Sequence, residues 1–248
     1  MKHARFVCIL VFTAATLASA QSKTVPFVGR MFPAESGVFG ATTGTVGFFA
    51  APVAYDSGGW RAESVAMADL NGDGKLDLVV ANGCSSNTNC LNGVVGVLLG
   101  NGDGTFQNAV LYGSGGGGGY LANSVTIADV NGDGKPDLLV ANRCEFYLGH
   151  CGSDTIGVLL GNGDGTFRTT VVSNSGRAKS IAAVDVNRDG KLDLVVANEC
   201  TFGPGNCPEG TVGILLGNGD GTFRAGSSYR SGGLISDSVA VGDFNGGW

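Results

Sequence analysis

Short apolar segments separated by polar turns recur along the chain, and their pattern predicts an all-β protein. In the second repeating unit they are AVLYG from Ala109, SVTIAD from Ser124, DLLVAN from Asp137 and TIGVLLG from Thr155. The segments are rich in Val, Ile and Leu and are bounded by Gly, Asn and Asp, as β-strands are. No segment shows the sustained 3.6-residue period of an amphipathic helix.

The same segments return about every 58 residues, which identifies a repeat protein. An acidic motif, LNGDGKLDLVVANGC from Leu70, returns as VNGDGKPDLLVANRC from Val130 and VNRDGKLDLVVANEC from Val186. A second motif, GVLLGNGDGTF, begins at Gly96 and Gly157 and returns as GILLGNGDGTF from Gly213. DLLVAN and GVLLG do not alternate, so we expect both faces of these strands to be covered. Four such strands per repeat predict a β-propeller of four-stranded antiparallel blades.

We expect three complete blades, at residues 50–106, 107–167 and 168–223, and a partial blade at 224–248. A signal peptide is predicted at residues 1–20, where Lys2 and Arg5 precede the apolar run FVCILVFTAATL and the small residues before Gln21. The apolar run is shorter than the roughly 20 residues that span a bilayer. The chain is therefore expected to be secreted or on the cell surface after cleavage near Ala20, without membrane insertion.

The repeats resemble the FG-GAP (VCBS-type) repeats of the integrin α-subunit propeller and of many secreted bacterial proteins. The resemblance covers roughly residues 45–248. It is carried by the acidic loops that begin at Asp69, Asp129 and Asp185, and by the GNGDGTF segments that end at Phe106, Phe167 and Phe223. It implies a calcium-stabilised propeller, commonly of seven blades, that serves adhesion or recognition.

The chain is shorter than the resemblance implies. Seven blades of this size would need about 400 residues, whereas the sequence has 248, and Gly247 stands where the fourth acidic loop should have an aspartate. We expect a truncated or open propeller; a four-bladed ring and closure by self-association are the alternatives. The segment GVFGATTGTVGFFAAPVAYDSG from Gly37 is similar to GVLLGNGDGTFQNAVLYGSG, so the N-terminus is expected to supply an outer strand.

The acidic loops have the oxygen pattern of calcium sites. Numbered from Asp69, the first loop has side-chain oxygens at positions 1, 3, 5 and 9 and a glycine at position 6. With the carbonyl of position 7, these residues supply about six oxygen ligands. The predicted ligands, with each lysine contributing its backbone carbonyl and turning its side chain to solvent, are Asp69, Asn71, Asp73, Lys75, Asp77, Asp129, Asn131, Asp133, Lys135, Asp137, Asp185, Asn187, Asp189, Lys191 and Asp193.

A bare turn would explain the Asn-Gly pairs, but not carboxylates at positions 1, 5 and 9 of all three loops. We therefore predict three structural calcium sites. An EF-hand would require a glutamate at position 12, which is Val80 here. A dockerin-like module shares the loop but continues as a helix, for which DLVVAN is a poor start.

Six cysteines remain after the signal peptide, two in each repeat. Export would place them in an oxidising compartment. Six cysteines allow fifteen pairings, and the repeat selects the one in which each pair shares a loop: Cys84 with Cys90, Cys144 with Cys151, and Cys200 with Cys207.

The remaining features indicate a non-enzymatic recognition protein. The formal net charge of −6 argues against nucleic acid as a partner. No catalytic motif is visible, and the acids outside the repeat, Glu63, Glu145, Asp154, Glu199 and Glu209, have no visible partner. We expect a protein or carbohydrate ligand, bound at the variable loops Glu145 to His150 and Thr201 to Asn206. The alternatives are the non-catalytic part of a polysaccharide lyase or hydrolase, and a dockerin-like assembly module.

Overall fold

The computed structural model describes residues 52–88, 90, 92–116, 120–144, 155–174, 177–199, 209–233 and 235–244. The predicted signal peptide and both variable loops lie outside these residues. The chain divides into two compact units, Met1–Ala54 and Tyr55–Trp248, and the strands that the structure describes belong to the second.

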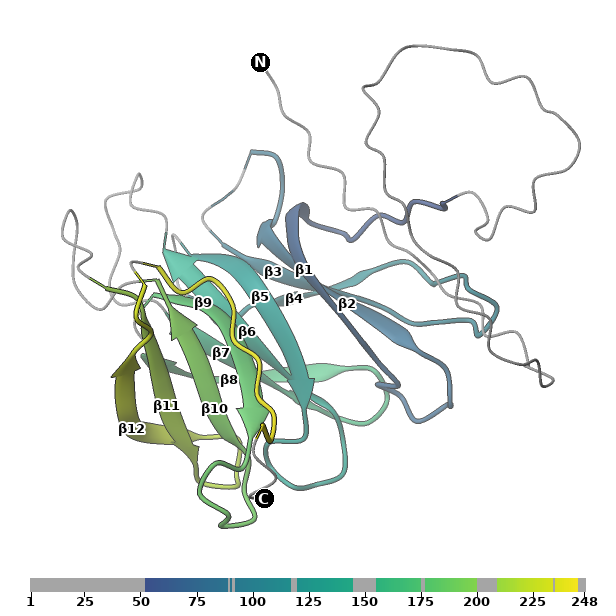
Figure 1. Ribbon diagram of the computed structural model, residues 1–248. Helices are drawn as coiled ribbons and strands as arrows, with labels where there is room; N and C mark the ends of the chain where they lie inside the picture. Colours follow the sequence, from purple (N-terminus) through teal and green to yellow (C-terminus); the bar gives the residue numbers. More distant parts are fainter. Residues whose placement is uncertain are drawn as a thin grey trace, which may run out of the picture. The chain divides into compact units, whose positions relative to one another are not determined.

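The described residues form three four-stranded antiparallel sheets (Figure 1). The first contains β1 (Trp60–Ala68), β2 (Asp77–Cys84), β3 (Val94–Leu98) and β4 (Val110–Gly113) in that order. The second contains β5 (Tyr120–Ala128), β6 (Asp137–Cys144), β7 (Thr155–Gly161) and β8 (Phe167–Asn174). The third contains β9 (Ala178–Val184), β10 (Asp193–Asn198), β11 (Thr211–Gly217) and β12 (Phe223–Arg230). This confirms the predicted all-β class and gives an open, partial propeller.

No helix occurs among the residues that the structure describes. It follows that none in this part of the chain is long and apolar enough to cross a membrane.

The sheets begin and end later than the predicted blade boundaries. AVLYG was expected to open the second blade, but β4, which contains most of it, pairs with β3 and completes the first sheet. The cause is the GNGDGTF turn, in which the Asn101 N–H donates to the Thr105 carbonyl at 2.9 Å. Gly102 and Gly104 take positive φ angles of 83° and 86° there. The chain therefore reverses onto β3 instead of starting a new sheet.

The partial fourth blade was expected at residues 224–248, but most of residues 224–230 belong to β12, which pairs with β11 and completes the third sheet. Residues 235–244 contain no assigned strand. They nevertheless contact the third sheet, because the Val239 N–H donates to Ser180 Oγ at 3.4 Å.

The apolar core lies in two layers, one between each pair of neighbouring sheets, as the lack of alternation predicted. The middle sheet supplies both layers. Leu138 and Val140 on β6 face the first sheet, while Leu139 and Ala141 face the third. All four side chains are fully buried.

Neighbouring sheets are also joined at their first strands by side-chain hydrogen bonds. The Val125 N–H on β5 donates to Ser64 Oγ on β1 at 3.3 Å. Thr126 Oγ1 donates to the Ile181 carbonyl on β9 at 2.7 Å. Each acidic loop follows one of these first strands, so the three loops lie at equivalent places on the three sheets.

Candidate metal centres

The acidic loops connect the first and second strands of each sheet, and the aspartate at position 1 curls each loop. In the first loop, Asp69 Oδ1 accepts hydrogen bonds from the N–H groups of Gly72, at 2.8 Å, and Asp73, at 3.2 Å. Its Oδ2 accepts the Gly74 N–H at 2.8 Å. One carboxylate thus satisfies three successive backbone donors.

The side chains at positions 3 and 5 each bond the backbone two residues further on. Asn71 Oδ1 accepts the Asp73 N–H at 3.0 Å, and Asp73 Oδ1 accepts the Lys75 N–H at 2.9 Å. The same bonds recur in the second loop and in the third. The three loops therefore share one geometry.

Position 4 of the loop requires a left-handed backbone. Gly72 and Gly132 have φ angles of 75° and 72°, and a Cβ at either would meet nothing within 4 Å. Arg188 occupies this position in the third loop with φ of 59°. The Arg188 side chain therefore stands on a backbone conformation that favours glycine.

The aspartate at position 9 has a role that the sequence analysis missed. Asp77 is fully buried. Its Oδ1 accepts the Gly100 N–H at 2.7 Å, and its Oδ2 accepts the Leu70 N–H at 2.9 Å. Asp137 and Asp193 make the equivalent bonds in the other sheets. This carboxylate therefore fastens the acidic loop to the end of the third strand. The sequence signal for this contact was the glycine that recurs just after or at the end of each third strand, at Gly100, Gly161 and Gly217.

The loop carboxylates titrate differently according to their surroundings. Burial raises the pKa of Asp137, and the nearby charges of Asp133 and Asp129 raise it further, against the backbone N–H bonds that lower it. The Lys75 N–H lowers the pKa of Asp73. Burial raises the pKa of Asp185, but the loop N–H groups outweigh it and the net change is downward.

The predicted ligands are brought into one loop per sheet, without converging on a common point. Among the described residues, no group of three or more His, Cys, Asp or Glu side chains is arranged to hold a metal ion. Side-chain oxygens at positions 1, 3, 5 and 9 of the first loop accept backbone N–H groups; Asp69 Oδ1 accepts two of them, whereas the other bonded oxygens accept one each and retain a second lone pair. Hard oxygen donors of this kind fit the chemistry of calcium.

The predicted lysine orientation is only partly correct. The Lys75 side chain is 43% exposed, and its Nζ lies 3.3 Å from Asp73 Oδ2. Its stem crosses the neighbouring turn, since a Cβ at Gly102 would lie 3.0 Å from Lys75 Cδ. The long aliphatic stem covers the turn while the ammonium group pairs with the loop.

The GNGDGTF segments form tight turns. Asp103 Oδ1 accepts the Thr105 N–H at 2.9 Å and the Thr105 hydroxyl at 2.6 Å. The Thr105 hydroxyl lowers the pKa of Asp103. Phe106, at the end of the turn, packs edge-on against Tyr55 with ring centroids 5.3 Å apart.

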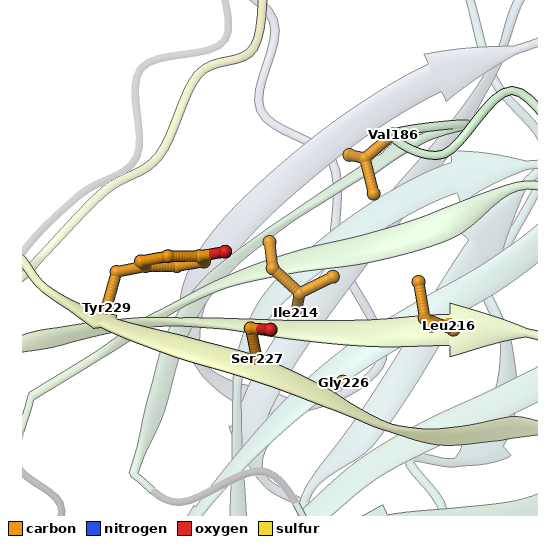
Figure 2. Close-up of a pocket in the computed structure, with 6 residues that line it drawn as sticks. All are labelled: Val186, Ile214, Leu216, Gly226, Ser227 and Tyr229. Atoms are coloured by element: carbon orange, nitrogen blue, oxygen red, sulfur yellow. The ribbon is translucent and has the colours of Figure 1, made fainter.

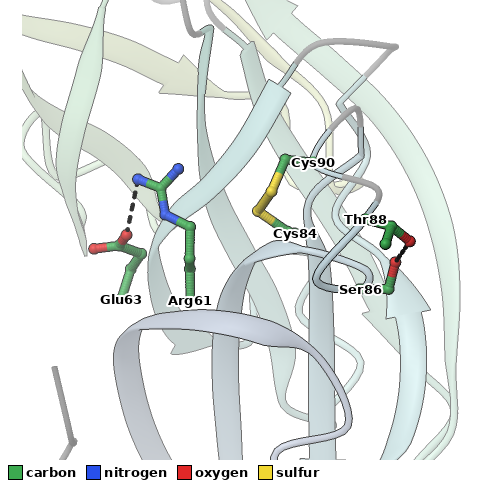
Figure 3. The surroundings of a disulfide bond; sticks show 6 residues. All are labelled: Arg61, Glu63, Cys84, Ser86, Thr88 and Cys90. Atoms are coloured by element: carbon green, nitrogen blue, oxygen red, sulfur yellow. Dashed lines mark hydrogen bonds and ion pairs between the residues drawn. A yellow bond between two sulfur atoms is a disulfide. The ribbon is translucent and has the colours of Figure 1, made fainter. Parts of the chain in front are cut away.

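One of the three predicted disulfides falls within the described residues, and it is confirmed. Cys84, at the end of β2, is bonded to Cys90 with an S–S distance of 2.03 Å (Figure 3). Arg61 and Glu63 form an ion pair nearby. The other two predicted pairs involve Cys151, Cys200 and Cys207, which lie outside the described residues.

The expectation that the non-repeated acids lack partners is wrong for Glu63, which pairs with Arg61, and for Glu209, which pairs with Arg230. It is also wrong for Glu199. Its Oε2 lies 3.5 Å from Arg143 on β6, 3.8 Å from Arg177 and 3.9 Å from Lys179 on β9. The Lys179 ammonium also lies 3.6 Å from Asp237. This cluster joins the second and third sheets. Sequence reasoning could not find it, because its members come from different repeats and have no equivalents elsewhere.

A family model described as "FG-GAP-like repeat" matches residues 83–140 and 143–196. The chain contains two FG-GAP-like repeats. A search of curated proteins found no match. The matched segments include the acidic loops from Asp129 and Asp185. The loop from Asp69 precedes them, and it belongs to the same set because its hydrogen bonds repeat theirs.

Proposed function

We propose that this protein is a secreted or cell-surface recognition module whose propeller sheets are stabilised by calcium and bind a protein or glycan. The observation that carries the proposal is the threefold recurrence of one acidic loop geometry on a rigid β framework. FG-GAP repeats are typically not catalytic, and the repeated aspartates already have structural roles. A dockerin-like role is disfavoured because strands β2, β6 and β10, and no helix, follow the loops in the described residues.

Each calcium site would use the oxygens of one acidic loop. In the first loop these are the side chains of Asp69, Asn71, Asp73 and Asp77 and the carbonyl of Lys75. Bound calcium would supply positive charge that offsets three carboxylates close together in one loop. For Kd near 10⁻⁴ M and about 1 mM calcium, each site adds roughly 1.4 kcal/mol, and three add about 4 kcal/mol.

Thermal unfolding with and without calcium tests this part of the proposal. About 4 kcal/mol corresponds to a rise in Tm of roughly 8–16 °C for a chain of this size. We expect Asp133→Asn to lose about a third of the rise. Asp164→Asn, which removes the same charge from a GNGDGTF turn, is the matched control and should keep all of it. An identical Tm in 1 mM calcium and in excess chelator would remove calcium from the proposal.

Ligand binding tests the recognition role separately. Immobilised polysaccharides and extracellular matrix proteins would be screened with the full chain in calcium, and the soluble products would be measured in the same wells. Saturable binding without product formation supports recognition. Release of oligosaccharides would instead support the polysaccharide lyase or hydrolase alternative, and no binding to either class would contradict the proposed ligand classes.

A further inference from the structure

A buried asparagine lies near the end of the second strand in every sheet. Asn82 on β2, Asn142 on β6 and Asn198 on β10 are at most 3% exposed. A buried amide needs hydrogen-bond partners for both its nitrogen and its oxygen, because an unpaired buried polar atom destabilises the fold. The three sheets meet this need in different ways.

In the first sheet, the segment that precedes β1 satisfies the whole amide group. Asn82 Nδ2 donates to the Ser57 carbonyl at 3.3 Å, and Ser57 Oγ donates to Asn82 Oδ1 at 2.7 Å. The residue opposite Asn82 on β3 is Val94, whose side chain has no polar atom. The serine and asparagine side chains of the first sheet are therefore satisfied by each other.

In the second sheet the backbone is placed in the same way, but the serine hydroxyl is not. Ser114 precedes β5 as Ser57 precedes β1, and Asn142 Nδ2 donates to the Ser114 carbonyl at 2.8 Å. In both sheets this serine carbonyl lies over a glycine of the third strand, where a Cβ at Gly96 or Gly157 would collide with it. However, Asn142 Oδ1 and Ser114 Oγ are buried without a hydrogen-bond partner among the described residues.

A third oxygen of this kind lies opposite Asn142. Thr155 on β7 is the register partner of Asn142, and Thr155 Oγ1 is buried without a hydrogen-bond partner in the part of the chain that the structure describes. Side chains of directly opposite residues in an antiparallel pair lie on the same face, with Cβ atoms about 5 Å apart. The Asn142 and Thr155 oxygens are therefore neighbours that do not bond each other directly.

The third sheet repeats the asparagine–threonine pair. Thr211 on β11 is the register partner of Asn198, and Asn198 Oδ1 and Thr211 Oγ1 are again buried without a partner among the described residues. Side chains alternate along β11, and Leu215 belongs to the core layer against the second sheet, so Thr211 lies on that face as well.

The opposite face of β11 carries a different feature. It holds a mainly apolar pocket of about 300 Å³ (Figure 2), lined by Val186, Ile214, Leu216, Gly226, Ser227 and Tyr229. Ile214 and Leu216 alternate with Leu215 along the strand, so this pocket is separate from the buried pair of Asn198 and Thr211.

We propose that each of these two asparagine–threonine pairs binds one ordered water molecule. In the second sheet the water accepts hydrogen bonds from the Thr155 and Ser114 hydroxyls and donates one to Asn142 Oδ1. Buried waters in proteins typically make about three hydrogen bonds of this kind. Water suits the site because the three groups carry no charge, and because one molecule that both accepts and donates satisfies hydroxyl donors and an amide acceptor together.

The residue opposite the asparagine determines whether the water binds. Threonine supplies a hydroxyl to the water, whereas Val94 of the first sheet supplies none, and there the Ser57 hydroxyl bonds Asn82 directly. The first sheet is therefore a dry control within the same chain. In the second sheet the water joins the segment that enters the sheet, through Ser114, to both β6 and β7.

A crystal structure of the full chain, at a resolution that shows ordered water, tests the proposal. We expect an electron-density peak about 2.8 Å from both Asn142 Oδ1 and Thr155 Oγ1. A matching peak should lie between Asn198 and Thr211, and no peak should lie beside Asn82. Density without a peak at either pair overturns the proposal, and so does a direct bond from the serine hydroxyl to Asn142 Oδ1.

Two exchange variants test whether the threonine determines binding. Thr155→Val should remove the water of the second sheet and turn the Ser114 hydroxyl onto Asn142 Oδ1, as in the first sheet. Val94→Thr should add a water beside Asn82. Each variant carries the residue that another repeat has at this position, so both should fold. A water that persists in Thr155→Val overturns the proposed role of the threonine, and so does a Val94→Thr variant that gains no water.

Nuclear Overhauser spectroscopy in solution gives a second readout that does not depend on crystal packing. A long-lived buried water should give cross-peaks from the water resonance to the methyl groups of Thr155 and Thr211. In Val94→Thr, the new threonine methyl should show the same cross-peak. Wild-type spectra without a water cross-peak at either threonine would contradict the proposal.

Discussion

Asp77→Asn separates the two roles that the ninth loop position combines. The carboxylate is fully buried and accepts the N–H groups of Gly100 and Leu70 at 2.7 and 2.9 Å. Asparagine is nearly isosteric, but its amide NH₂ would face one of these donors. One buried N–H then loses its acceptor, which costs about 1–3 kcal/mol, and the remaining bond is no longer charge-assisted. We expect about 2–3 kcal/mol of lost stability even without metal.

The assay is thermal unfolding in excess chelator, at fixed protein concentration, followed by circular dichroism. For a chain of this size, 2–3 kcal/mol lowers Tm by roughly 4–12 °C. Asp73→Asn is the matched control, because Asp73 Oδ1 accepts the Lys75 N–H, a bond that asparagine keeps. The substitution otherwise removes only an exposed ion pair between Asp73 Oδ2 and the Lys75 ammonium, which contributes little. In chelator it should unfold within about 2 °C of the wild type. In calcium, both variants should lose the contribution of one site.

The result that would refute this reasoning is specific. In that result, Asp77→Asn has the Tm of the wild type in chelator and a lower Tm only in calcium. It would mean that the buried backbone bonds contribute nothing to stability and that position 9 acts solely as a metal ligand. If Asp77→Asn and Asp73→Asn lower the Tm in chelator by the same amount, the charge of the loop, and not the buried bonds, controls stability.

Two further substitutions test the described contacts. Glu199→Gln leaves Arg143, Arg177 and Lys179 without their shared anion, at a site where the glutamate side chain is 16% exposed. Chemical denaturation should therefore show a loss of about 2 kcal/mol in the free energy of unfolding. The control Glu209→Gln breaks the exposed pair with Arg230 and should cost less than about 1 kcal/mol. Arg188→Gly removes a side chain from a left-handed position with φ of 59° and should raise stability by up to about 1 kcal/mol; a lower Tm would mean that the contacts of the Arg188 side chain outweigh the backbone strain.

The strands were predictable because the same pattern of strand residues recurs in each repeat. Three copies of DLVVAN-like segments distinguish a strand from a chance apolar run, and their lack of alternation correctly predicted burial on both faces. The residues at which each blade begins and ends were not predictable in this way. A cyclic pattern of four strands has no marked beginning, and only the pairing of β3 with β4 fixes where each sheet ends.

The candidate site was predictable for the residues that act locally. Asp69, Asn71 and Asp73 bond backbone groups within five residues of themselves, so their spacing alone carries the loop geometry. Asp77 also bonds Gly100, which is 23 positions away, and Glu199 meets Arg143 from another sheet. Such contacts depend on how strands and sheets pair, which spacing along one repeat does not encode.

The long-range bond of Asp77 explains why the acidic loop and the GNGDGTF turn occur together in every complete repeat. The carboxylate holds the N–H of Gly100 at the start of the turn, and the Lys75 stem lies across Gly102 within it. A side chain at Gly100 would collide with the Leu76 carbonyl, because its Cβ would lie 2.1 Å from that oxygen. The two motifs are thus one structural unit, and a change that opens the acidic loop also releases the end of the third strand. In the first two sheets that strand carries Val97 or Val158 in the core layer against the next sheet, so the loop supports the surface through which these sheets meet the next one.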